Sequence, residues 1–421
     1  MMKIRYRFPK FHLDWKEDEF KGIFDFHQTN TFSRSQMNNR RGFARNIHYG
    51  DILTKYGNIL SDLQEVPYIN KDISLLKVKE ESYLQNGDIV IADTAEDLTV
   101  GKAMEVQNID GKILSGLHTI LCRPKFKFAP RFLGYNLNSS SYRMNLIPLV
   151  VGVKVCSISK TNISKTLVMY PDDINEQQKI ADCLSSIDDL ISAEEKKLSL
   201  LNDYKKGWIQ KLFPAEGKTV PEWRFPEFMN SGDWEENSLK KVLIKNSMKN
   251  KNQKYSLIES ISNKFGFVRQ DKYFENRRVA SKNTSNYYVI KKGYFAYNPS
   301  RIDVGSLAYK YDDRTSIISP LYVSFKANND VIDDIFLWMF FNSISFTKQM
   351  IFEGGVRNTL NYENLIQIKI FLPNLPEQQK IAGFLSGIDD LINKQTDKIK
   401  ILKQHKKALT QGLFPAVEEV L

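Results

Sequence analysis

The amino-acid sequence predicts an α+β protein: two mixed α/β globular domains, separated by two long helices that form an antiparallel coiled coil with pseudo-two-fold symmetry. Two observations carry this prediction. A segment of forty residues occurs twice, and each copy follows a longer segment rich in strand signals. A chain of 421 residues is also too long for one ordinary core, which agrees with two domains.

The repeated segment occupies residues 176–215 and, 201 positions later, residues 377–416. The two copies align without a gap, and 22 of the 40 aligned positions are identical. The segments that precede the copies do not match each other in their interiors. The chain is therefore built twice on one plan, in four consecutive parts at residues 1–175, 176–215, 216–376 and 377–421.

Apolar residues form a stripe along each copy, with spacings that alternate between four and three residues, as in the a/d seam of a coiled coil. Polar residues interrupt the stripe at matching places, Glu194 and Lys205 in the first copy and Gln395 and Lys406 in the second. A helix of about 38 residues is about 57 Å long, which favours a coiled coil over packing within one domain. The matching interruptions indicate that the two helices pair with each other, and chain order favours an antiparallel pair.

The two longer segments are expected to be mixed α and β. β-branched and aromatic runs, punctuated by Gly and Asn, predict short strands at residues 87–92, 115–124, 287–298 and 319–327. One helix is expected at residues 332–349. Both segments open with Arg-Phe-Pro and close with a strand that ends in proline. A shared frame around different contents is typical of two domains that recognise different targets.

The charge of the chain favours a polyanionic partner. The formal net charge is +11 and the isoelectric point is about 9.2, which makes nucleic acid the first candidate. The alternative is a mildly basic protein with no specific anionic partner. The internal doubling favours duplex DNA, because duplex DNA is the commonest partner with two-fold character.

Composition also predicts where the chain works. The sequence has no run of eighteen apolar residues and does not start like a secretory signal, so we expect neither a membrane segment nor export. Its three cysteines, Cys122, Cys156 and Cys183, are scattered and lack metal-ligand spacing. Isolated thiols are typical of a reducing compartment, so a cytoplasmic protein is expected.

We expect no catalytic, metal or cofactor site in this chain. The run Gly217-Lys218-Thr219 lacks the upstream glycine of a phosphate-binding loop. The run Asn298-Pro299-Ser300-Arg301 lacks the second proline and the aromatic residue of an adenine methyltransferase motif. The five histidines are dispersed. Two other classes of protein stay open at this point: a self-contained DNA methyltransferase or nuclease, and a scaffold whose coiled coil merely pairs two domains.

The doubled helix resembles one known family. Its pattern EQQKIA–L–IDDLI, with each copy preceded by a strand ending in proline, is similar to that of the specificity subunit of type I restriction–modification systems. The resemblance covers essentially the whole chain. It implies target recognition domain 1 at 1–175, conserved-region helix 1 at 176–215, target recognition domain 2 at 216–376, and conserved-region helix 2 with a C-terminal tail at 377–421.

The resemblance also implies a function. Each recognition domain would read one half of a bipartite, asymmetric site in double-stranded DNA, and the coiled coil would set the length of the spacer. The subunit itself would do no chemistry. Its implied partners are two modification subunits that methylate adenine and, in the full complex, restriction subunits with motor and nuclease activity. S-adenosylmethionine, ATP and Mg are then expected in those partner subunits, with no cofactor in this chain.

Candidate contact residues follow from chemistry, because basic side chains bind phosphates and Arg, Asn, Gln and Lys read base edges. The densest cluster of donors lies at residues 31–45 (TFSRSQMNNRRGFAR), and its alternative is a solvated basic loop. The predicted DNA-binding residues are Arg34, Asn39, Arg40, Arg41 and Arg45, with Asn38 in the same cluster, and Arg269, Arg277, Arg278, Lys282, Arg301, Arg357 and Asn358. The predicted partner-binding residues on the repeats are Gln177, Asp188, Asp189, Gln378, Asp389 and Asp390.

Overall fold

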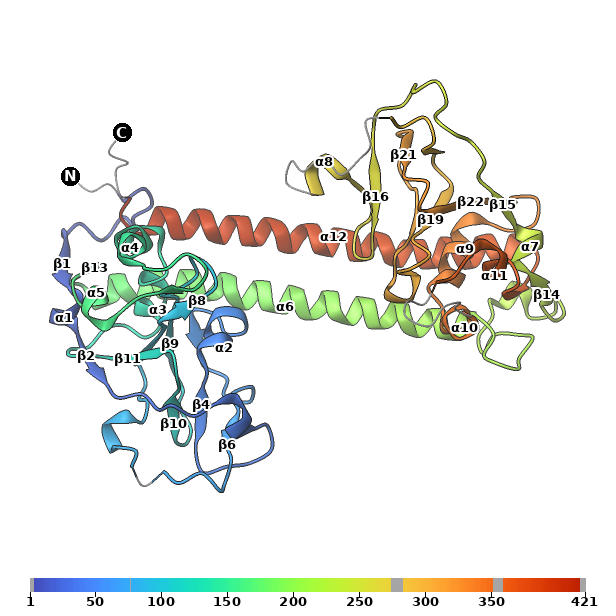
Figure 1. Cartoon of the computed structure of the whole chain (residues 1–421). Helices are drawn as coiled ribbons and strands as arrows, with labels where there is room; N and C mark the ends of the chain where they lie inside the picture. The colour runs from blue at the N-terminus through green and yellow to red at the C-terminus, as the bar shows by residue number, and fades with distance from the viewer. Residues whose placement is uncertain (1–3, 76, 274–282, 351–358, 417–421) are drawn as a thin grey trace. The chain divides into compact units, whose positions relative to one another are not determined.

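The computed structural model describes residues 4–75, 77–273, 283–350 and 359–416. The chain divides into two units (Figure 1): unit 1 contains residues 1–195 and 397–421, and unit 2 contains residues 196–396. Each unit combines small sheets and short helices with part of each of two long helices, α6 (Ile174–Leu212) and α12 (Leu375–Leu413). The predicted α+β class, with two mixed domains and two long helices, is confirmed.

The short elements of unit 1 fill the chain before α6. Its strands are β1 (Trp15–Glu19), β2 (Phe24–His27), β3 (Met37–Asn38), β4 (Arg45–Ile47), β5 (Ile59–Leu60), β6 (Tyr68–Ile69), β7 (Ile89–Ala92), β8 (Thr94–Ala95), β9 (Ala103–Val106), β10 (Ile113–Ser115), β11 (Thr119–Pro124), β12 (Cys156–Ser157) and β13 (Leu167–Pro171). Its short α-helices are α1 (Phe20–Ile23), α2 (Tyr49–Thr54), α3 (Phe132–Asn136), α4 (Ser140–Leu146) and α5 (Lys160–Ile163).

The short elements of unit 2 lie between the two long helices. Its strands are β14 (Glu235–Ser238), β15 (Leu243–Lys245), β16 (Glu259–Ser262), β17 (Gly266–Arg269), β18 (Tyr288–Ile290), β19 (Tyr294–Tyr297), β20 (Leu307–Tyr309), β21 (Ser316–Ile318), β22 (Val323–Ala327) and β23 (Lys369–Leu372). Its short α-helices are α7 (Leu239–Val242), α8 (Gln270–Tyr273), α9 (Asp334–Phe341), α10 (Ile344–Gln349) and α11 (Tyr362–Leu365).

The two units share one sheet topology. In unit 1 a sheet runs in the order β2-β11-β7-β9-β5, and in unit 2 a sheet runs in the order β15-β22-β19-β20. The first four strands correspond one to one, and each neighbouring pair among them is antiparallel. A second correspondence closes each domain, because β1 pairs with β13 and β14 pairs with β23. The same framework is therefore built twice from segments whose interiors differ in sequence.

Both long helices begin and end at local signals in the sequence. The side chain of Asp173 accepts a hydrogen bond from the backbone of Asn175 at 2.8 Å, and that of Asn374 accepts one from the backbone of Glu377 at 3.0 Å. Such caps satisfy backbone groups at a helix start. The helices therefore start two residues before the predicted boundaries, and each ends just before a Phe-Pro pair.

One helix predicted in unit 2 is two. The predicted span 332–349 contains α9 and α10, which are separated at Asn342 and Ser343. The hydroxyl of Ser343 accepts a hydrogen bond from the backbone of Phe346 at 3.3 Å and so starts a new helix. The apolar run of α9 hid this break, because a cap residue within an apolar run leaves the periodicity intact.

Each unit buries part of both long helices in its main core. In unit 1 Ile180 and Leu184 of α6 join a cluster that also contains Leu413 of α12. In unit 2 Leu212 of α6 joins a cluster that also contains Leu385 of α12. Burial of such side chains contributes about 1.5–3 kcal/mol each to folding. Each long helix therefore contributes apolar side chains to the cores of both units.

Ion pairs between α6 and α12 join the two helices in both units and show that they run antiparallel in unit 1. In unit 1 Asp188 pairs with Lys406 at 2.5 Å, and Glu194 pairs with Lys398 at 2.5 Å. The residue number rises along one helix as it falls along the other. In unit 2 Lys205 pairs with Asp389 at 2.6 Å. This pair is the counterpart of Lys406 with Asp188, since both residues are shifted by 201 positions. Three of the four predicted polar interruptions, Glu194, Lys205 and Lys406, thus form ion pairs between the two helices.

An arginine from the start of each domain holds the first glutamate of each repeat. Arg7 donates from Nε and Nη2 to the two carboxylate oxygens of Glu176, both at 2.9 Å. Arg224 donates in the same way to Glu377, both at 2.7 Å. The glutamate side chains are 3% and 0% exposed and the arginine side chains 23% and 11%, so each bidentate pair has a buried anion and a partly buried cation. Hydrogen bonding to glutamate raises the pKa of both arginines. The Arg-Phe-Pro motif therefore ties the start of each domain to the start of a helix.

We predict that Glu377→Ala lowers the free energy of unfolding by about 3 kcal/mol, because it leaves the partly buried guanidinium of Arg224 without its anion. Urea unfolding followed by circular dichroism measures this change. The control is Glu236→Ala, which removes one partner of the exposed Lys369–Glu236 pair and should cost less than about 1 kcal/mol. Equal losses in the two variants would contradict the prediction.

Candidate nucleic-acid interface

The predicted basic cluster of unit 1 is a loop anchored in the core. It occupies residues 31–44, hereafter loop 31–44, and connects β2 to β4 by way of the two-residue strand β3, which pairs with β6. The residue before it, Asn30, donates from its backbone and from Nδ2 to the carbonyl of Ser115, both at 3.0 Å. Its Oδ1 accepts a hydrogen bond from the backbone of Phe32 at 3.0 Å. One asparagine therefore fixes the direction in which the loop leaves the sheet.

The tip of loop 31–44 presents three of the predicted DNA-binding residues to solvent. The side chain of Asn38 accepts hydrogen bonds from the backbones of Arg40 and Arg41 at 2.9 and 3.0 Å, which forms a tight turn. Asn39, Arg40 and Arg41 are exposed. At Gly42 a Cβ atom would lie 2.3 Å from the carbonyl oxygen of Ile69, so glycine is required there. The loop thus holds two guanidinium groups and an amide outward on a supported turn.

Sequence reasoning missed an aromatic residue beside this turn. Phe43 is 71% exposed, and Nζ of Lys71 lies 5.7 Å from the centroid of its ring. An exposed aromatic ring beside cations offers a face on which a base of a nucleic acid can stack. The signal in the sequence is the pair Arg41 and Phe43 around a glycine.

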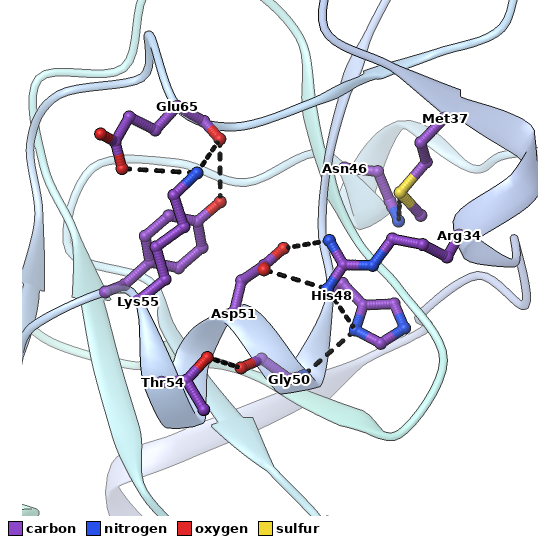
Figure 2. A network of polar contacts seen from close by, with 10 residues as sticks. Arg34, Met37, Asn46, His48, Gly50, Asp51, Thr54, Lys55 and Glu65 are labelled. Atoms are coloured by element: carbon purple, nitrogen blue, oxygen red, sulfur yellow. Dashed lines mark hydrogen bonds and ion pairs between the residues drawn. The ribbon is translucent and has the colours of Figure 1, made fainter. Parts of the chain in front are cut away.

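Arg34 is only partly available, because it forms an ion pair inside unit 1. Figure 2 shows its guanidinium directed at Asp51, with Nη1 and Nη2 lying 2.8 and 3.0 Å from the carboxylate oxygens. That hydrogen bonding raises the pKa of Arg34. Burial, followed by the charge of Arg34, lowers the pKa of His48, which keeps a ring nitrogen free to accept from the backbone of Gly50 at 3.1 Å. Arg34 therefore uses some of its N–H donors to hold Asp51 of α2.

Arg45 requires a correction. Its Nη1 donates to the carbonyl oxygens of Leu63 and Val66 at 2.5 and 2.6 Å, and its Nη2 donates to the hydroxyl of Tyr68 at 2.7 Å. The guanidinium also lies 4.1 Å from the centroid of the Tyr68 ring. These acceptors occupy the polar edge of the side chain, so Arg45 supports the fold and is not a free DNA contact.

The predicted residues of unit 2 lie on separate elements. Arg269, at the end of β17, pairs with Asp271 at 2.6 Å, so its charge is partly neutralised. Arg301, in the turn before Ile302, is exposed, and it forms no ion pair within the part of the chain that the structure describes. The other predicted residues lie outside the described residues: Arg277, Arg278, Lys282, Arg357 and Asn358.

Two predicted partner contacts are buried, which argues against a contact role. Gln177 is 2% exposed and Gln378 is 1% exposed. Their oxygens accept from the backbones of Ala129 and Asp333, both at 2.9 Å, and their amides donate to backbone carbonyls before the helix. These glutamines therefore attach the helix to its own domain. They are better described as structural than as surface residues.

The four aspartates that were predicted to contact a partner divide into two pairs. Asp188 and Asp389 are half-buried and form the ion pairs with the opposite helix described above. Asp189 and Asp390 are exposed and remain candidates for contact with a partner. The paired carboxylates therefore have different roles within each pair, one inside the helix pairing and one on the surface.

Two structural searches bear on alternative functions, and both cover only the described ranges. Residues 4–75, 77–273, 283–350 and 359–416 contain no cluster of three or more His, Cys, Asp or Glu suited to a metal ion. In the same ranges no helix combines the length and apolar character needed to cross a membrane.

Comparison with known proteins identifies the family. The family model described as "Type I restriction modification DNA specificity domain" matches residues 12–203 and 231–404. These two matches cover most of both units. The chain belongs to the type I restriction–modification DNA specificity family. Each matched region runs from one recognition domain into the long helix that follows it, so the family model occurs twice, in agreement with the internal repeat.

Individual relatives agree with this assignment. The chain is 26% identical over 356 residues to a putative type I restriction enzyme MjaX specificity subunit of Methanocaldococcus jannaschii, which covers 77% of this chain and 76% of the relative. It is 30% identical over 257 residues to the MjaVIII specificity subunit of the same organism, which covers 56% of this chain and 59% of that relative.

Solved structures share the fold. The type I restriction–modification S subunit from M. genitalium covers 99% of this chain and is itself covered completely, with a TM-score of 0.60 at 13% identity. A second structure, from work on complex assembly and conformational transition of the type I R-M system, covers 97% of this chain and 98% of its own, with a TM-score of 0.56 at 14% identity. At this identity the likeness concerns the fold alone.

We predict that Arg45→Ala lowers the free energy of unfolding by about 1–3 kcal/mol, because it leaves the carbonyls of Leu63 and Val66 without a donor. The matched double variant Arg40→Ala/Arg41→Ala should change it by less than about 0.5 kcal/mol, since both side chains are exposed. Thermal unfolding distinguishes the two. A larger loss in the double variant would overturn this division between structural and surface arginines.

Proposed function

We propose that this chain reads a bipartite, asymmetric DNA site, with each recognition domain responsible for one half. One observation carries the proposal: the two units share their framework but differ in the loops that the framework presents. Two domains that bind the same kind of molecule, but different sequences of it, would need this combination. The chain's membership in the DNA specificity family supports the same reading.

In unit 1 the tip of loop 31–44 would enter a groove of the duplex. Arg40 and Arg41 carry donors suited to phosphate oxygens or to the O6 and N7 edge of guanine, and Asn39 can pair with adenine. Phe43 offers a flat apolar face beside them. The supported turn reduces the entropy lost on binding, because the backbone of the tip is already fixed by Asn38.

The long helices would set the spacer between the two half-sites. Both are 39 residues long, about 58 Å at 1.5 Å per residue. Ion pairs at matching positions, Lys205 with Asp389 and Lys406 with Asp188, resist sliding of one helix along the other. A constant spacer requires helices of fixed length that stay in one register, and these ion pairs favour a single register.

The repeats would also recruit two modification subunits, which methylate adenine. Exposed aliphatic residues occur at equivalent positions of the two repeats: Leu190 is 43% and Leu391 is 52% exposed, and Leu200 is 59% and Ile401 is 63% exposed. Isolated apolar residues on a surface are ordinary, but their duplication at one offset favours two copies of the same partner. Asp189 and Asp390 lie next to the first pair and would add matching charges.

The same proposal assigns the chemistry of the complex to other chains. S-adenosylmethionine would be bound by the modification subunits, and ATP and Mg by the modification or restriction subunits that complete the assembly. This chain would recognise the DNA sequence and would contribute no group to the reaction. The complex would meet its DNA in the cytoplasm.

We predict that Arg40→Ala/Arg41→Ala weakens binding of the assembled complex to its DNA about tenfold or more, because two charge-assisted contacts are lost. Electrophoretic mobility shift with the full complex measures the change. The control is Arg5→Ala/Lys10→Ala, which removes two exposed charges of the same unit outside loop 31–44. Unchanged affinity in the first variant would remove the loop from the interface.

Genome-wide mapping of methylated adenines in cells that carry this subunit tests the proposal as a whole. The expected result is one bipartite motif with two dissimilar halves and a spacer of constant length. Methylation at a single undivided motif, or none that depends on this chain, would contradict it.

We predict that Leu190→Ser/Leu391→Ser weakens association with the modification subunits about tenfold per site, since one apolar anchor is lost at each. Co-purification and analytical ultracentrifugation measure the stoichiometry. Leu98→Ser/Leu321→Ser is the matched control, because it removes one exposed leucine from each unit away from the helices. If both double variants retain two modification subunits, the helix surfaces are not the docking sites.

A further inference from the structure

Unit 2 contains a loop in the same topological place as loop 31–44. Residues 247–257, hereafter loop 247–257, leave β15, which corresponds to β2. The loop ends at Ile258, which forms a parallel bridge with Ile317 of β21. Loop 31–44 likewise ends at β4, which runs parallel to β10. Strands β10 and β21 directly precede β11 and β22, which correspond in the two sheets. The two loops therefore connect equivalent neighbours.

The two loops also begin with the same anchor. Asn246 donates from its backbone to the carbonyl of Ser324 at 2.9 Å and accepts at Oδ1 from the backbone of Met248 at 3.0 Å. Asn30 makes the same turn in unit 1, where Phe32, two residues on, donates to its Oδ1. Its backbone donates to Ser115 of β10, so the strand that accepts this hydrogen bond differs from that in unit 2. The shared turn is notable because the rest of the loop sequences do not align. Each loop therefore starts with an asparagine whose side chain closes a turn to the second residue after it.

The contents of the two loops match in chemistry. Loop 31–44 contains three basic residues, three Asn or Gln residues and no acidic residue. Loop 247–257 also contains three basic residues, three Asn or Gln residues and no acidic residue. Its basic residues are Lys249, Lys251 and Lys254, and its amides are Asn250, Asn252 and Gln253. The combination of cations and amides without carboxylates is the combination that contacts DNA backbone and base edges.

The structure directs most of these side chains outward. Asn250 is buried: it donates to the carbonyl of Tyr255 at 3.0 Å and accepts from the same residue's backbone at 3.1 Å, which closes the tip. Lys251 and Lys254 are exposed. Nζ of Lys249 lies 3.1 Å from the centroid of the Tyr288 ring, so this lysine is held at the base of the loop. Within the described ranges none of the three lysines forms an ion pair, so their charges are not neutralised by the fold.

We propose that loop 247–257 is the DNA-contacting counterpart of loop 31–44 in unit 2. Lys251 and Lys254 bind phosphates of the half-site that unit 2 reads, and Asn252 at the tip reaches a base edge. This inference rests on the proposed function and adds a contact element that residue patterns alone did not indicate. A solvated lysine-rich loop with no partner is the alternative, and the experiments below separate the two.

The test is Lys251→Ala/Lys254→Ala in the full chain, assembled with its modification subunits. Binding to a labelled duplex carrying the mapped site, and to a scrambled duplex, is followed by fluorescence anisotropy over a range of salt concentrations. Each lost phosphate contact reduces the slope of log K against log salt by about 0.9. The expected reduction is therefore about 1.8, with affinity lowered to a similar extent on both duplexes.

The matched control is Lys240→Ala/Lys241→Ala. It removes two exposed charges of α7, at the other end of β15 from the loop. Its salt slope should equal that of the parent complex. If the control reduced the salt slope as much as the loop variant does, the effect would come from the net charge of the unit rather than from this loop. That result would overturn the inference. A loop variant with the parent slope would overturn it as well.

The two proposals fail in different ways. If the parent complex does not prefer the mapped duplex, the proposed function fails. If the parent prefers it and the loop variant binds like the parent, only the present inference fails. Asn252→Ala gives a further readout: mapping of methylated adenines should show relaxed sequence at one half-site, with the other half-site and the spacer unchanged. An unaltered half-site would overturn the role of Asn252 at a base edge.

Discussion

The architecture depends on an arginine–glutamate pair with a buried carboxylate that occurs once in each unit. Arg7 holds Glu176, and Arg224 holds Glu377, each through two parallel hydrogen bonds. The glutamate lies in the first turn of a long helix, where a negative charge is favoured by the helix dipole. The arginine lies at the opening of a domain some 150–170 residues earlier in the sequence. The pair therefore joins the start of each domain to the first turn of the long helix that follows it.

The sequence predicted the features of the fold that repeat or have a period. An internal repeat locates the two long helices, because identical residues at one offset need no structural knowledge to find. The breaks between short helices were harder to predict. Ser343 divides one predicted helix into two, and a cap within an apolar run leaves no trace in periodicity. The correspondence of the two larger sheets could not be predicted either, because their strands share topology and not sequence.

The candidate site was also predicted only in part from the sequence. Residue type and local density correctly directed attention to loop 31–44, but the role of each arginine depends on acceptors distant in sequence. Arg45 is occupied by the carbonyls of Leu63 and Val66, and Arg34 by Asp51. Loop 247–257 was overlooked because a run of Lys and Asn looks like any solvated turn. The strands that flank loop 247–257 and their pairing partners show that it corresponds to loop 31–44, and the sequence alone does not show this.

The division of the chain has a consequence for how the protein is made. Unit 2 is continuous, but unit 1 needs residues 1–195 together with 397–421, and Leu413 and Phe414 lie in its main core. On the ribosome the first domain to be synthesised is therefore the last that can be completed. Domains usually fold in order of synthesis. Here the N-terminal domain must wait with part of its apolar surface uncovered, and a premature stop near the C-terminus would damage the N-terminal domain first.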